Sequence, residues 1–395
     1  MRQLGHTSPM NHDDQRIRVL RIIARMNVGG PAIQVSGLMR NLNVEVFEQR
    51  LFTGFCEANE SDYLEKVATD IKVTRIDGFG RRVNLLGDIK SLMVLIKEIR
   101  KFKPHIIHTH TTKAGFIGRV ASILSLYPTI RIHTFHGHLL SGYFGKYKTY
   151  LIILSERFLA LFTDQLLAVG DKVMQDLLQA KIGEKDKFSI MPPGLQLNSL
   201  PPTWESRDIL GLTRKQMYCS YIGRVTQIKR PDRFLDVVRE IGKRNIDLHF
   251  LIVGDGELLD YCRKRIAQEK LPVKVLGWRN DIERVLSASN IVILTSDNEG
   301  TPLSLIQAGM ANIPVVTTNV GSISEVVLNG ITGIITSAEV NELADALEKL
   351  SNDSLLMQSL GVNAQKFTKS NFGVERLVSD HEELYQKLIS NRTDS

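Results

Sequence analysis

The sequence predicts an α/β protein made of two doubly wound, Rossmann-like domains with mainly parallel sheets. Its 395 residues are too many for one compact domain and suit two, since domains usually hold about 100–200 residues. Short apolar runs alternate with amphipathic stretches in both halves, which is typical of βαβ units. A segment rich in proline and turn formers, residues 192–206, separates the halves and is the predicted linker.

Five apolar runs are the predicted strands of the first half. They are Val19–Ala24, Ile106–His108, Ile132–Thr134, Leu166–Val169 and Phe188–Met191. Helices are expected from about Ala32 to Leu42 and over Ala114–Leu124. Ligands of such folds bind beyond the carboxyl ends of the strands, so the loops that follow these runs are the candidate sites.

The second half repeats the pattern. Its predicted strands are Cys219–Ile222, His249–Val253, Val273–Leu276, Ile291–Thr295 and Pro314–Thr317. Amphipathic spacing after Pro231 predicts a helix there, and another is expected to start near Pro302. The expected organisation is a flexible tail over 1–15, a first domain over 16–198 and a second over 199–370.

Composition excludes several classes of protein. Hydrophobic residues make up 43% and charged residues 24%, which is normal for a globular chain. Three widely spaced cysteines give neither a disulfide framework nor a zinc motif. No apolar run approaches the ~20 residues of a membrane span, and residues 1–15 do not resemble a signal peptide. A soluble cytoplasmic protein is therefore expected.

The net charge of +7 is unevenly distributed. Residues 1–200 hold 27 Lys and Arg against 18 Asp and Glu, whereas residues 201–395 hold 23 against 25. No acidic residue lies between Glu98 and Glu156, a stretch with eight lysines and arginines and six histidines. The first half is expected to face something anionic, with a solvated basic surface as the alternative.

Two strand-end loops are suited to phosphate groups. Gly29 and Gly30 follow the first strand and precede a helix, where free N–H groups attract anions, although a purely steric turn is an equal alternative. In the second half, Gly223 and Arg224 follow a strand and Lys229 precedes the next helix. Arg224 and Lys229 could clamp a diphosphate, or be two exposed loop cations.

The segment from Glu299 to Gln307 is the most informative part of the sequence. Glu299 follows a predicted strand, where its carboxylate could accept hydrogen bonds from sugar hydroxyls or simply cap the helix. Backbone N–H groups near the helix start could face a phosphate or the sugar; the residues here are Gly300, Thr301, Pro302 and Leu303. The amide of Gln307 could reach a ribose.

Taken together, these motifs resemble the retaining glycosyltransferases of family 4, glycosyl transferases group 1, which have the GT-B fold. The resemblance spans about Arg16 to Ile389. It rests on the motifs above together with His108–His110, His133–His138, Pro193–Gly194, Gly254–Gly256, Val320–Gly321 and Glu325.

The resemblance implies that the second domain binds a nucleotide-diphosphate sugar and the first binds the acceptor. Arg224 and Lys229 would hold the diphosphate, Gly29 and Gly30 would close over it, and Glu299 would contact the sugar. It also implies that the final helix, from about residue 371 to 395, packs back on the first domain. The family usually has glutamate where this chain has Gln307, so the ribose contact loses a charge.

The expected activity is a retaining hexosyl transfer, with a UDP-sugar as the favoured donor. Arg224 and Lys229 would stabilise the departing diphosphate, which would help to deprotonate the acceptor hydroxyl on the same face. No metal or other cofactor is expected, because histidines beside eight cations and no carboxylate make a poor cation site.

The histidines divide into functional and structural candidates. His136 is expected beside the reacting sugar, and His110, Lys113 and His138 on the acceptor side. His105 and His133 are expected to be structural. Lys113 and Arg119 could meet an acceptor phosphate or form the solvated face of their helix.

The acceptor is expected to be a saccharide or a lipid-linked glycan in bacterial polysaccharide, glycolipid or glycoconjugate synthesis. Aromatic residues and lysines mix over residues 139–148, which suits peripheral association with an anionic inner membrane face. The alternatives are a soluble acceptor, a nucleotide-sugar epimerase of the same fold, a basic binding protein without catalysis and a silent homologue. Nucleic acid is not an expected partner, because aromatic residues do not interleave the cations. The sequence does not indicate the oligomeric state.

Overall fold

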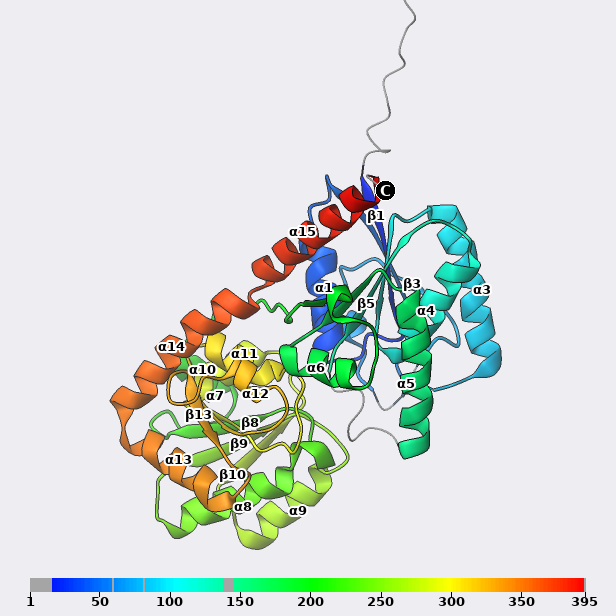
Figure 1. Cartoon of the computed structure of the whole chain (residues 1–395). Helices are drawn as coiled ribbons and strands as arrows, with labels where there is room; N and C mark the ends of the chain where they lie inside the picture. The colour runs from blue at the N-terminus through cyan, green and yellow to red at the C-terminus, as the bar shows by residue number, and fades with distance from the viewer. Residues whose placement is uncertain (1–15, 59, 81, 138–144, 394–395) are drawn as a thin grey trace, which may run out of the picture.

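The computed structural model describes residues 16–58, 60–80, 82–137 and 145–393, which form two α/β units, each built around a parallel sheet (Figure 1). The first sheet has the order β3-β2-β1-β4-β5-β6-β7. Its strands are β1 (Ile17–Ile23), β2 (Phe47–Thr53), β3 (Thr74–Arg75), β4 (Ile106–His110), β5 (Ile130–Phe135), β6 (Gln165–Ala168) and β7 (Phe188–Ile190). The predicted doubly wound class is confirmed.

Helices cover both faces of this sheet (Figure 1). They are α1 (Gly30–Asn41), α2 (Tyr63–Lys66), α3 (Leu85–Phe102), α4 (Thr112–Leu124), α5 (Lys146–Leu161) and α6 (Asp171–Gln179). Asn84 caps α3 by accepting a hydrogen bond from the Gly87 N–H, which satisfies one free donor of the first turn. The strand order reverses between β1 and β4, so the loops after these strands open a crevice at one edge of the sheet.

The second sheet has the order β10-β9-β8-β11-β12-β13 and reverses between β8 and β11. Its strands are β8 (Tyr218–Ile222), β9 (His249–Val253), β10 (Val273–Gly277), β11 (Ile291–Leu294), β12 (Val315–Thr318) and β13 (Gly333–Thr336). Its helices are α7 (Thr203–Ile209), α8 (Pro231–Lys243), α9 (Leu259–Glu269), α10 (Ile282–Ala288), α11 (Leu303–Met310), α12 (Ile323–Val326), α13 (Val340–Asn352) and α14 (Ser354–Phe372).

All ten predicted strands are present with ends within two residues, but β2, β3 and β13 were not predicted. The sequence of β2, FEQRLFT, has charged residues at its centre that mask its apolar ends. Strand β3 is two residues long, and β13 is an edge strand that begins with Gly333. The last four residues of the predicted linker are also helical, because α7 begins at Thr203.

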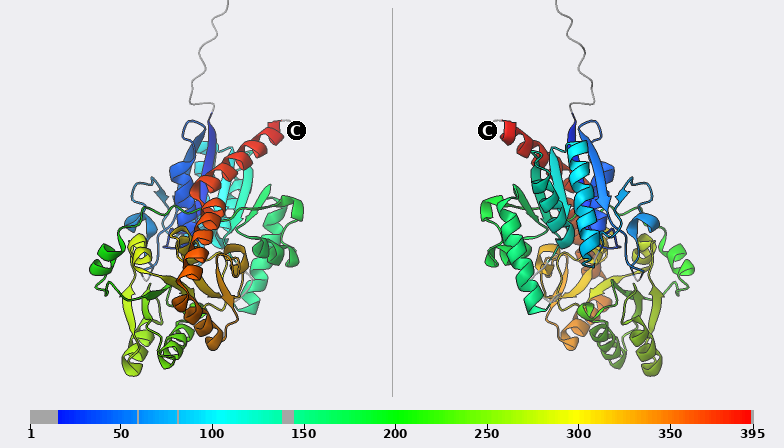
Figure 2. Two further views of the ribbon diagram at one scale, coloured as in Figure 1. Left: turned by 90° about the vertical axis from the view of Figure 1, so that its left-hand side faces the viewer. Right: turned by 90° about the vertical axis from the view of Figure 1, so that its right-hand side faces the viewer.

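The final helix, α15 (Val374–Thr393), leaves the second unit and lies along the first, as Figure 2 shows from two sides. Leu377 and Tyr385 are fully buried in the same apolar cluster as Val19 and Leu38. The family resemblance implied such a return from about residue 371, and the helix that lies along the first unit begins at Val374. Gly194 lies against α15 so closely that an added methyl group would be 2.3 Å from the Leu377 Cβ atom.

The two chain segments that cross between the units hydrogen-bond to each other. The Leu195 N–H donates to the Phe372 carbonyl at 2.8 Å, and the Val374 N–H donates to the Leu195 carbonyl at 3.0 Å. Arg376 donates to the carbonyls of Pro192 and Pro193. The Pro193–Gly194 motif therefore belongs to the crossing between the units.

Candidate active site

Loops at the carboxyl ends of both sheets meet between the two units. A methyl group added at Gly30, the first residue of α1, would lie 3.5 Å from the Leu303 side chain, the first residue of α11. One added at Gly300 would lie 3.2 Å from the Gly137 Cα atom and 3.6 Å from the His136 carbonyl oxygen. The structure therefore brings the predicted glycine loop, His136 and the Glu299–Leu303 segment together at the two switch points.

Lys229 and Glu299 are paired in this cleft. The Lys229 Nζ atom lies 2.5 Å from the Glu299 Oε1 atom, and both side chains are largely buried. Ser296 Oγ donates to the same carboxylate oxygen at 2.5 Å, which leaves Oε2 outside these contacts. The residue predicted to bind the diphosphate, Lys229, and the residue predicted to bind the sugar, Glu299, are therefore in direct contact.

Arg224 differs from Lys229 in being unengaged. Its residue is exposed, and its guanidinium makes no hydrogen bond or ion pair within the described part of the chain. Its backbone is fixed instead, because the Tyr221 hydroxyl donates to its carbonyl at 3.0 Å. Gly223 precedes it, against Gly254, where an added methyl group would come within 1.9 Å of the Gly223 oxygen. Arg224 is therefore a free cation on a held loop.

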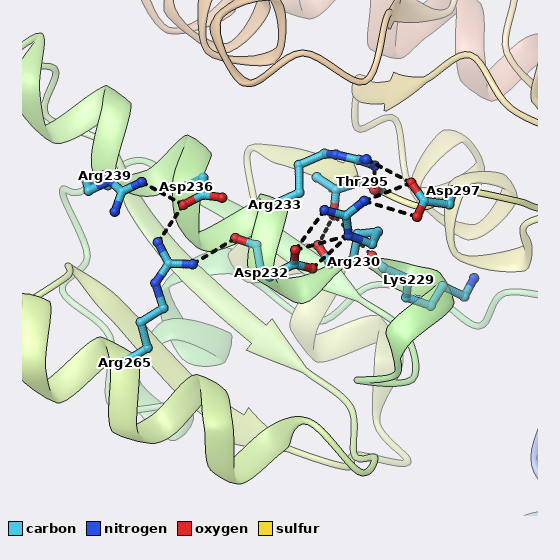
Figure 3. A network of polar contacts seen from close by, with 9 residues as sticks. All are labelled: Lys229, Arg230, Asp232, Arg233, Asp236, Arg239, Arg265, Thr295 and Asp297. Atoms are coloured by element: carbon cyan, nitrogen blue, oxygen red, sulfur yellow. Dashed lines mark hydrogen bonds and ion pairs between the residues drawn. The ribbon is translucent and has the colours of Figure 1, made fainter.

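A network of arginines and aspartates fixes the loops that carry Lys229 and Glu299 (Figure 3). Arg230 contacts both Asp232 and Asp297, at 2.8 and 3.1 Å. Arg233 donates to the Thr295 carbonyl at 2.6 Å and to Asp297 at 2.8 Å. Because Asp297 belongs to the loop after β11 and both arginines belong to the start of α8, this network locks one loop to the other.

The same network reaches the next helix. Arg265 of α9 donates to the Asp232 carbonyl at 3.1 Å and to the Asp236 carboxylate at 2.5 Å, and Arg239 donates to Asp236 at 2.7 Å (Figure 3). In the other direction, the Thr295 hydroxyl lies within hydrogen-bond distance of the carbonyls of Lys229 and Arg230. These contacts give the Lys229 backbone a fixed position.

The remaining donor-side predictions lie on and before α11. Pro302 is the N-cap residue, and the Thr301 hydroxyl is 3.5 Å from the Val169 carbonyl of the first unit. Gln307 lies one turn after Leu303 and is half-buried. The structure brings Gly300 to Leu303 to the cleft, whereas the ribose contact of Gln307 stays a prediction.

His136 lies at the head of a chain of buried polar rings. Its Nε2 atom is 3.0 Å from the His110 Nδ1 atom, and His110 stacks on His108 with ring centres 4.2 Å apart. Burial lowers the pKa of His136 to about 3, and burial also lowers the pKa of His110. Both imidazoles are therefore neutral at physiological pH.

The far end of this chain is built partly from α15. The His108 Nδ1 atom accepts from the Tyr385 hydroxyl at 2.6 Å and from the Arg21 guanidinium at 3.2 Å. Because arginine can only donate, the neutral His108 carries its proton on Nε2, which lies 2.7 Å from the Thr134 hydroxyl. The His381 ring of α15 lies with its centre 5.8 Å from that of His108, and the two ring planes are inclined by 24°.

Sequence reasoning missed three members of this cluster: Arg21, His381 and Tyr385. The signal for Arg21 was present, because a cation at the centre of an apolar strand needs an acceptor. Arg21 is fully buried and uses Gln49 and His108. The α15 residues could not be placed without knowing the packing of that helix.

The structure bears on three of the four acceptor-side predictions, and the fourth lies outside the described residues. His110 is fully buried behind His136, which is at odds with a direct acceptor contact. Arg119 is buried in an ion pair with Glu156 at 2.6 Å, so its guanidinium is neither solvated nor available to an acceptor phosphate. Lys113 is mostly buried and pairs with Asp88 at 2.6 Å. His138 lies outside the described residues.

His133 and His105, the two histidines that were expected to be structural, have packing roles in the structure. His133 is buried, 2.8 Å from the Thr109 hydroxyl, and leaves no room for a side chain at Gly115. The His105 Nδ1 atom accepts from the Arg18 N–H at 2.9 Å.

Glu325 connects the two units. Its carboxylate accepts the Asp171 N–H at 2.9 Å and the Lys172 N–H at 3.0 Å, at the start of α6. The N-cap of α6 is Gly170, which has no side chain, so Glu325 caps this helix from the second unit. The sequence singled out Glu325 only as part of a motif.

Comparisons with known proteins match both halves of the chain. The family model "Glycosyltransferase Family 4" matches residues 28–199, and "Glycosyl transferases group 1" matches residues 202–367. The chain is 28% identical over 342 residues to the UDP-Gal:alpha-D-GlcNAc-diphosphoundecaprenol alpha-1,3-galactosyltransferase of Escherichia coli, covering 84% of this chain and 87% of the relative.

Two further matches span most of the chain. It is 24% identical over 344 residues to the capsular polysaccharide biosynthesis glycosyltransferase CapM of Staphylococcus aureus, covering 83% and 89% of the two chains. The crystal structure of Anabaena HepE in complex with UDP-glucose superposes with a TM-score of 0.80 at 18% identity, covering 94% of this chain and 99% of HepE.

Proposed function

The chain belongs to glycosyltransferase family 4 and has the GT-B fold, and from this premise we propose that it transfers a hexose from a UDP-sugar to an acceptor hydroxyl with retention of anomeric configuration. The acceptor is a lipid-linked glycan used in bacterial polysaccharide or glycolipid synthesis. The relatives' names support this choice, because one uses UDP-Gal with a diphosphoundecaprenol-linked sugar and another serves capsular polysaccharide synthesis. A complex of HepE with UDP-glucose supports the UDP-sugar donor.

One observation carries the proposal: Lys229 and Glu299 form a buried pair, and Gly300, next to Glu299, touches the His136–Gly137 segment of the facing unit. A cation for the diphosphate and a carboxylate for sugar hydroxyls thus share one cleft. Gly30 approaches the same place from α1. This is the constellation that a nucleotide-diphosphate sugar requires, with phosphate-binding groups and sugar-binding groups side by side.

Cleavage of the anomeric bond leaves negative charge on the diphosphate. Lys229 and the free Arg224 would bind that charge, which stabilises the transition state more than the ground state. The Lys229–Glu299 contact must open for this, so donor binding replaces an internal ion pair by two ligand contacts. Glu299 is then free to accept hydrogen bonds from the sugar through both oxygens.

His136 serves the acceptor side of the reaction. Its low pKa keeps the ring neutral, so it can donate or accept one hydrogen bond beside the sugar without adding charge. The acceptor attacks from the face that the diphosphate leaves, and the diphosphate oxygen takes the hydroxyl proton. We expect this chemistry to proceed without a divalent metal ion.

A donor screen tests the proposal. The full-length protein is incubated with UDP-glucose, UDP-galactose, UDP-N-acetylglucosamine and GDP-mannose, and release of the nucleoside diphosphate is measured with and without EDTA. One UDP-sugar should be hydrolysed slowly, and Arg224→Ala should reduce this rate by 10-fold or more, on the order expected for one transition-state contact. Arg263→Ala is the matched control, since Arg263 is 56% exposed and pairs with Asp260 on the same helix, α9, outside the network of Figure 3.

Three outcomes would contradict the proposal. A change of the sugar without diphosphate release would indicate an epimerase. Equal rates for wild type and Arg224→Ala would remove Arg224 from the site, and loss of activity in EDTA would overturn the metal-free chemistry. Proton NMR of a transfer product determines whether the anomeric configuration is retained.

A further inference from the structure

Helix α5 presents an apolar face to solvent. Tyr147 is 77% exposed, Phe158 58% and Leu161 72%. The complete set of large apolar residues exposed on this helix and its C-cap is Tyr147, Tyr150, Leu151, Leu154, Phe158, Leu161 and Phe162. Their spacing of three and four residues places them on one side of the helix.

The opposite face of α5 contains the one acidic residue of this helix. Glu156 points into the protein, where it forms the fully buried ion pair with Arg119 of α4. Leu159 and Ala160 are buried beside it. A surface helix normally has this pattern reversed, with charges outward and apolar residues inward. The outward face of α5 is therefore an unpartnered apolar surface.

The neighbouring helices extend this surface. Helix α4 packs between α3 and α5, and the three helices lie side by side on one side of the first sheet (Figures 1 and 2). Phe116 of α4 is 47% exposed. The start of α3 adds the exposed residues Leu85, Leu86, Ile89 and Met93, and Val83 is exposed just before its N-cap residue. We call the outward side of α3, α4 and α5 the helical face.

Cations border the helical face. Lys97 and Lys101 are exposed along α3, and Lys148 is exposed near the start of α5, whereas Lys90 of α3 pairs with Asp77 at 3.7 Å. Between Glu98 and Asp164 the sequence has a single acidic residue, Glu156, and that one is buried and neutralised. The exposed charge of this stretch is therefore positive.

We propose that the helical face docks on the surface of an anionic phospholipid bilayer, with the α5 side chains among the acyl chains and the lysines at the headgroups. This inference rests on the proposed function, because a lipid-linked acceptor is presented at such a surface. Tyrosine, phenylalanine and leucine beside lysine are the residues that interfacial helices use. Each lysine near anionic lipid adds to the attraction.

A second copy of this chain is a less suitable occupant. A two-fold contact would place the same lysine-bordered surface against itself, and like charges would meet at its edge. No helix in the described residues is both long and apolar enough to cross a bilayer, which leaves an interfacial position for α5.

Vesicle sedimentation tests the proposal directly. The full-length protein is mixed with vesicles of phosphatidylcholine alone or with phosphatidylglycerol, at low and high salt. Wild type should bind the anionic vesicles, and high salt should weaken that binding. The double variant Leu154→Glu, Phe158→Glu should bind on the order of tenfold more weakly, because each glutamate removes apolar contact and adds repulsion.

Two controls keep the result specific. Leu355→Glu changes a leucine that is 77% exposed on α14 of the second unit, and it should bind vesicles like wild type. Lys97→Glu with Lys101→Glu should reduce binding to anionic vesicles and leave the weak binding to phosphatidylcholine unchanged. Circular dichroism melting curves should be the same for all variants.

The outcomes separate this inference from the proposed function. Vesicle binding without any donor hydrolysis would support the docking surface and overturn the proposed activity. Donor hydrolysis without vesicle binding would support the proposed activity and overturn the docking surface. Sedimentation velocity tests for a second copy at the same face. If wild type is a dimer that the double variant Leu154→Glu, Phe158→Glu dissociates, and wild type does not bind vesicles, the helical face is a contact between two copies. That result would overturn membrane docking.

Discussion

The Lys229 ammonium and the Glu299 carboxylate form an ion pair 2.5 Å long between loops that are 70 residues apart in sequence. Both side chains are largely buried. The network of Arg230, Arg233 and Asp297 holds both loops. The pair therefore occupies part of the cleft in which a donor diphosphate and sugar would bind. The two charges neutralise each other until a bound ligand separates the two side chains.

Replacing Glu299 by glutamine tests this competition. Glu299→Gln keeps the shape but frees Lys229, so UDP should bind as tightly as in wild type or more tightly. Turnover should fall by 10- to 1,000-fold, the order expected when a charged transition-state contact is lost. Calorimetry with UDP and steady-state kinetics measure the two effects. Glu348→Gln, a change at a half-exposed residue of α13, is the control, and weaker UDP binding in Glu299→Gln would contradict the competition.

Gln307→Glu tests the departure from the family pattern. A carboxylate accepts hydrogen bonds from ribose hydroxyls more strongly than a neutral amide does. The variant should lower the KM for the donor by a few-fold with little change in kcat. An unchanged KM would show that Gln307 does not contact the ribose.

Tyr385→Phe tests whether the polar rings behind His136 position it. The variant removes the hydroxyl that donates to His108, while Arg21 still donates to the same atom, so the stability loss should be about 1 kcal/mol. If the stacked rings hold His136, kcat should also fall several-fold with KM unchanged. Tyr218→Phe removes a hydroxyl that is hydrogen-bonded to Thr213 and Gln216 in the second unit. It should lower stability and leave kcat unchanged. The same result for Tyr385→Phe would make the cluster purely structural.

Glu325→Ala tests the contact between the units. The variant removes the only side-chain cap described for α6, which should cost about 0.5–2 kcal/mol of stability. It should also increase the radius of gyration in X-ray scattering and raise the donor KM, because the cleft opens more readily. Glu342→Ala removes a similar hydrogen bond to the Ser337 N–H within the second unit and should leave the radius unchanged. Equal radii for both variants would contradict this role.

The buried histidines predict how stability depends on pH. Burial lowers the pKa of His136 and of His381 to about 3, whereas histidines of an unfolded chain titrate near 6.5. Between these values the unfolded chain binds more protons, so stability is full above pH 6.5 and falls as the pH is lowered. The loss at pH 5 should be on the order of 1–2 kcal/mol per histidine.

Urea unfolding at pH 7 and pH 5 measures this loss. His381→Gln keeps a neutral donor toward the Leu377 carbonyl and should reduce the difference between the two pH values. An equal pH dependence in wild type and His381→Gln would contradict the assignment.

Much of the fold and of the donor side could be predicted because local sequence carries the information. Strand-end glycines and other residues that follow strands, such as Arg224 and Glu299, lie at the sheet edges that the alternation of strands and helices predicts. Strand β2 was missed because the charged residues at its centre obscure its apolar pattern.

The acceptor side could be predicted less well, because it depends on which side chains the tertiary structure buries. His110 ends a strand and Arg119 lies in the helix that follows it, where residues of a cleft are expected, yet both side chains are fully buried. The ion pair of Arg119 required a carboxylate from α5, 37 residues away. The cap on α6 required one from the other unit.

Helix α15 has a consequence for the order in which the protein is made. Leu377 and Tyr385 complete an apolar cluster whose other members include Val19 and Leu38, so residues from both ends of the chain close one core. On the ribosome, the first unit emerges long before these residues are synthesised, and it must wait with that cluster uncovered. The domain that is translated first is thus the last to be finished, and a message truncated before codon 374 would yield an incomplete first domain as well as a missing helix.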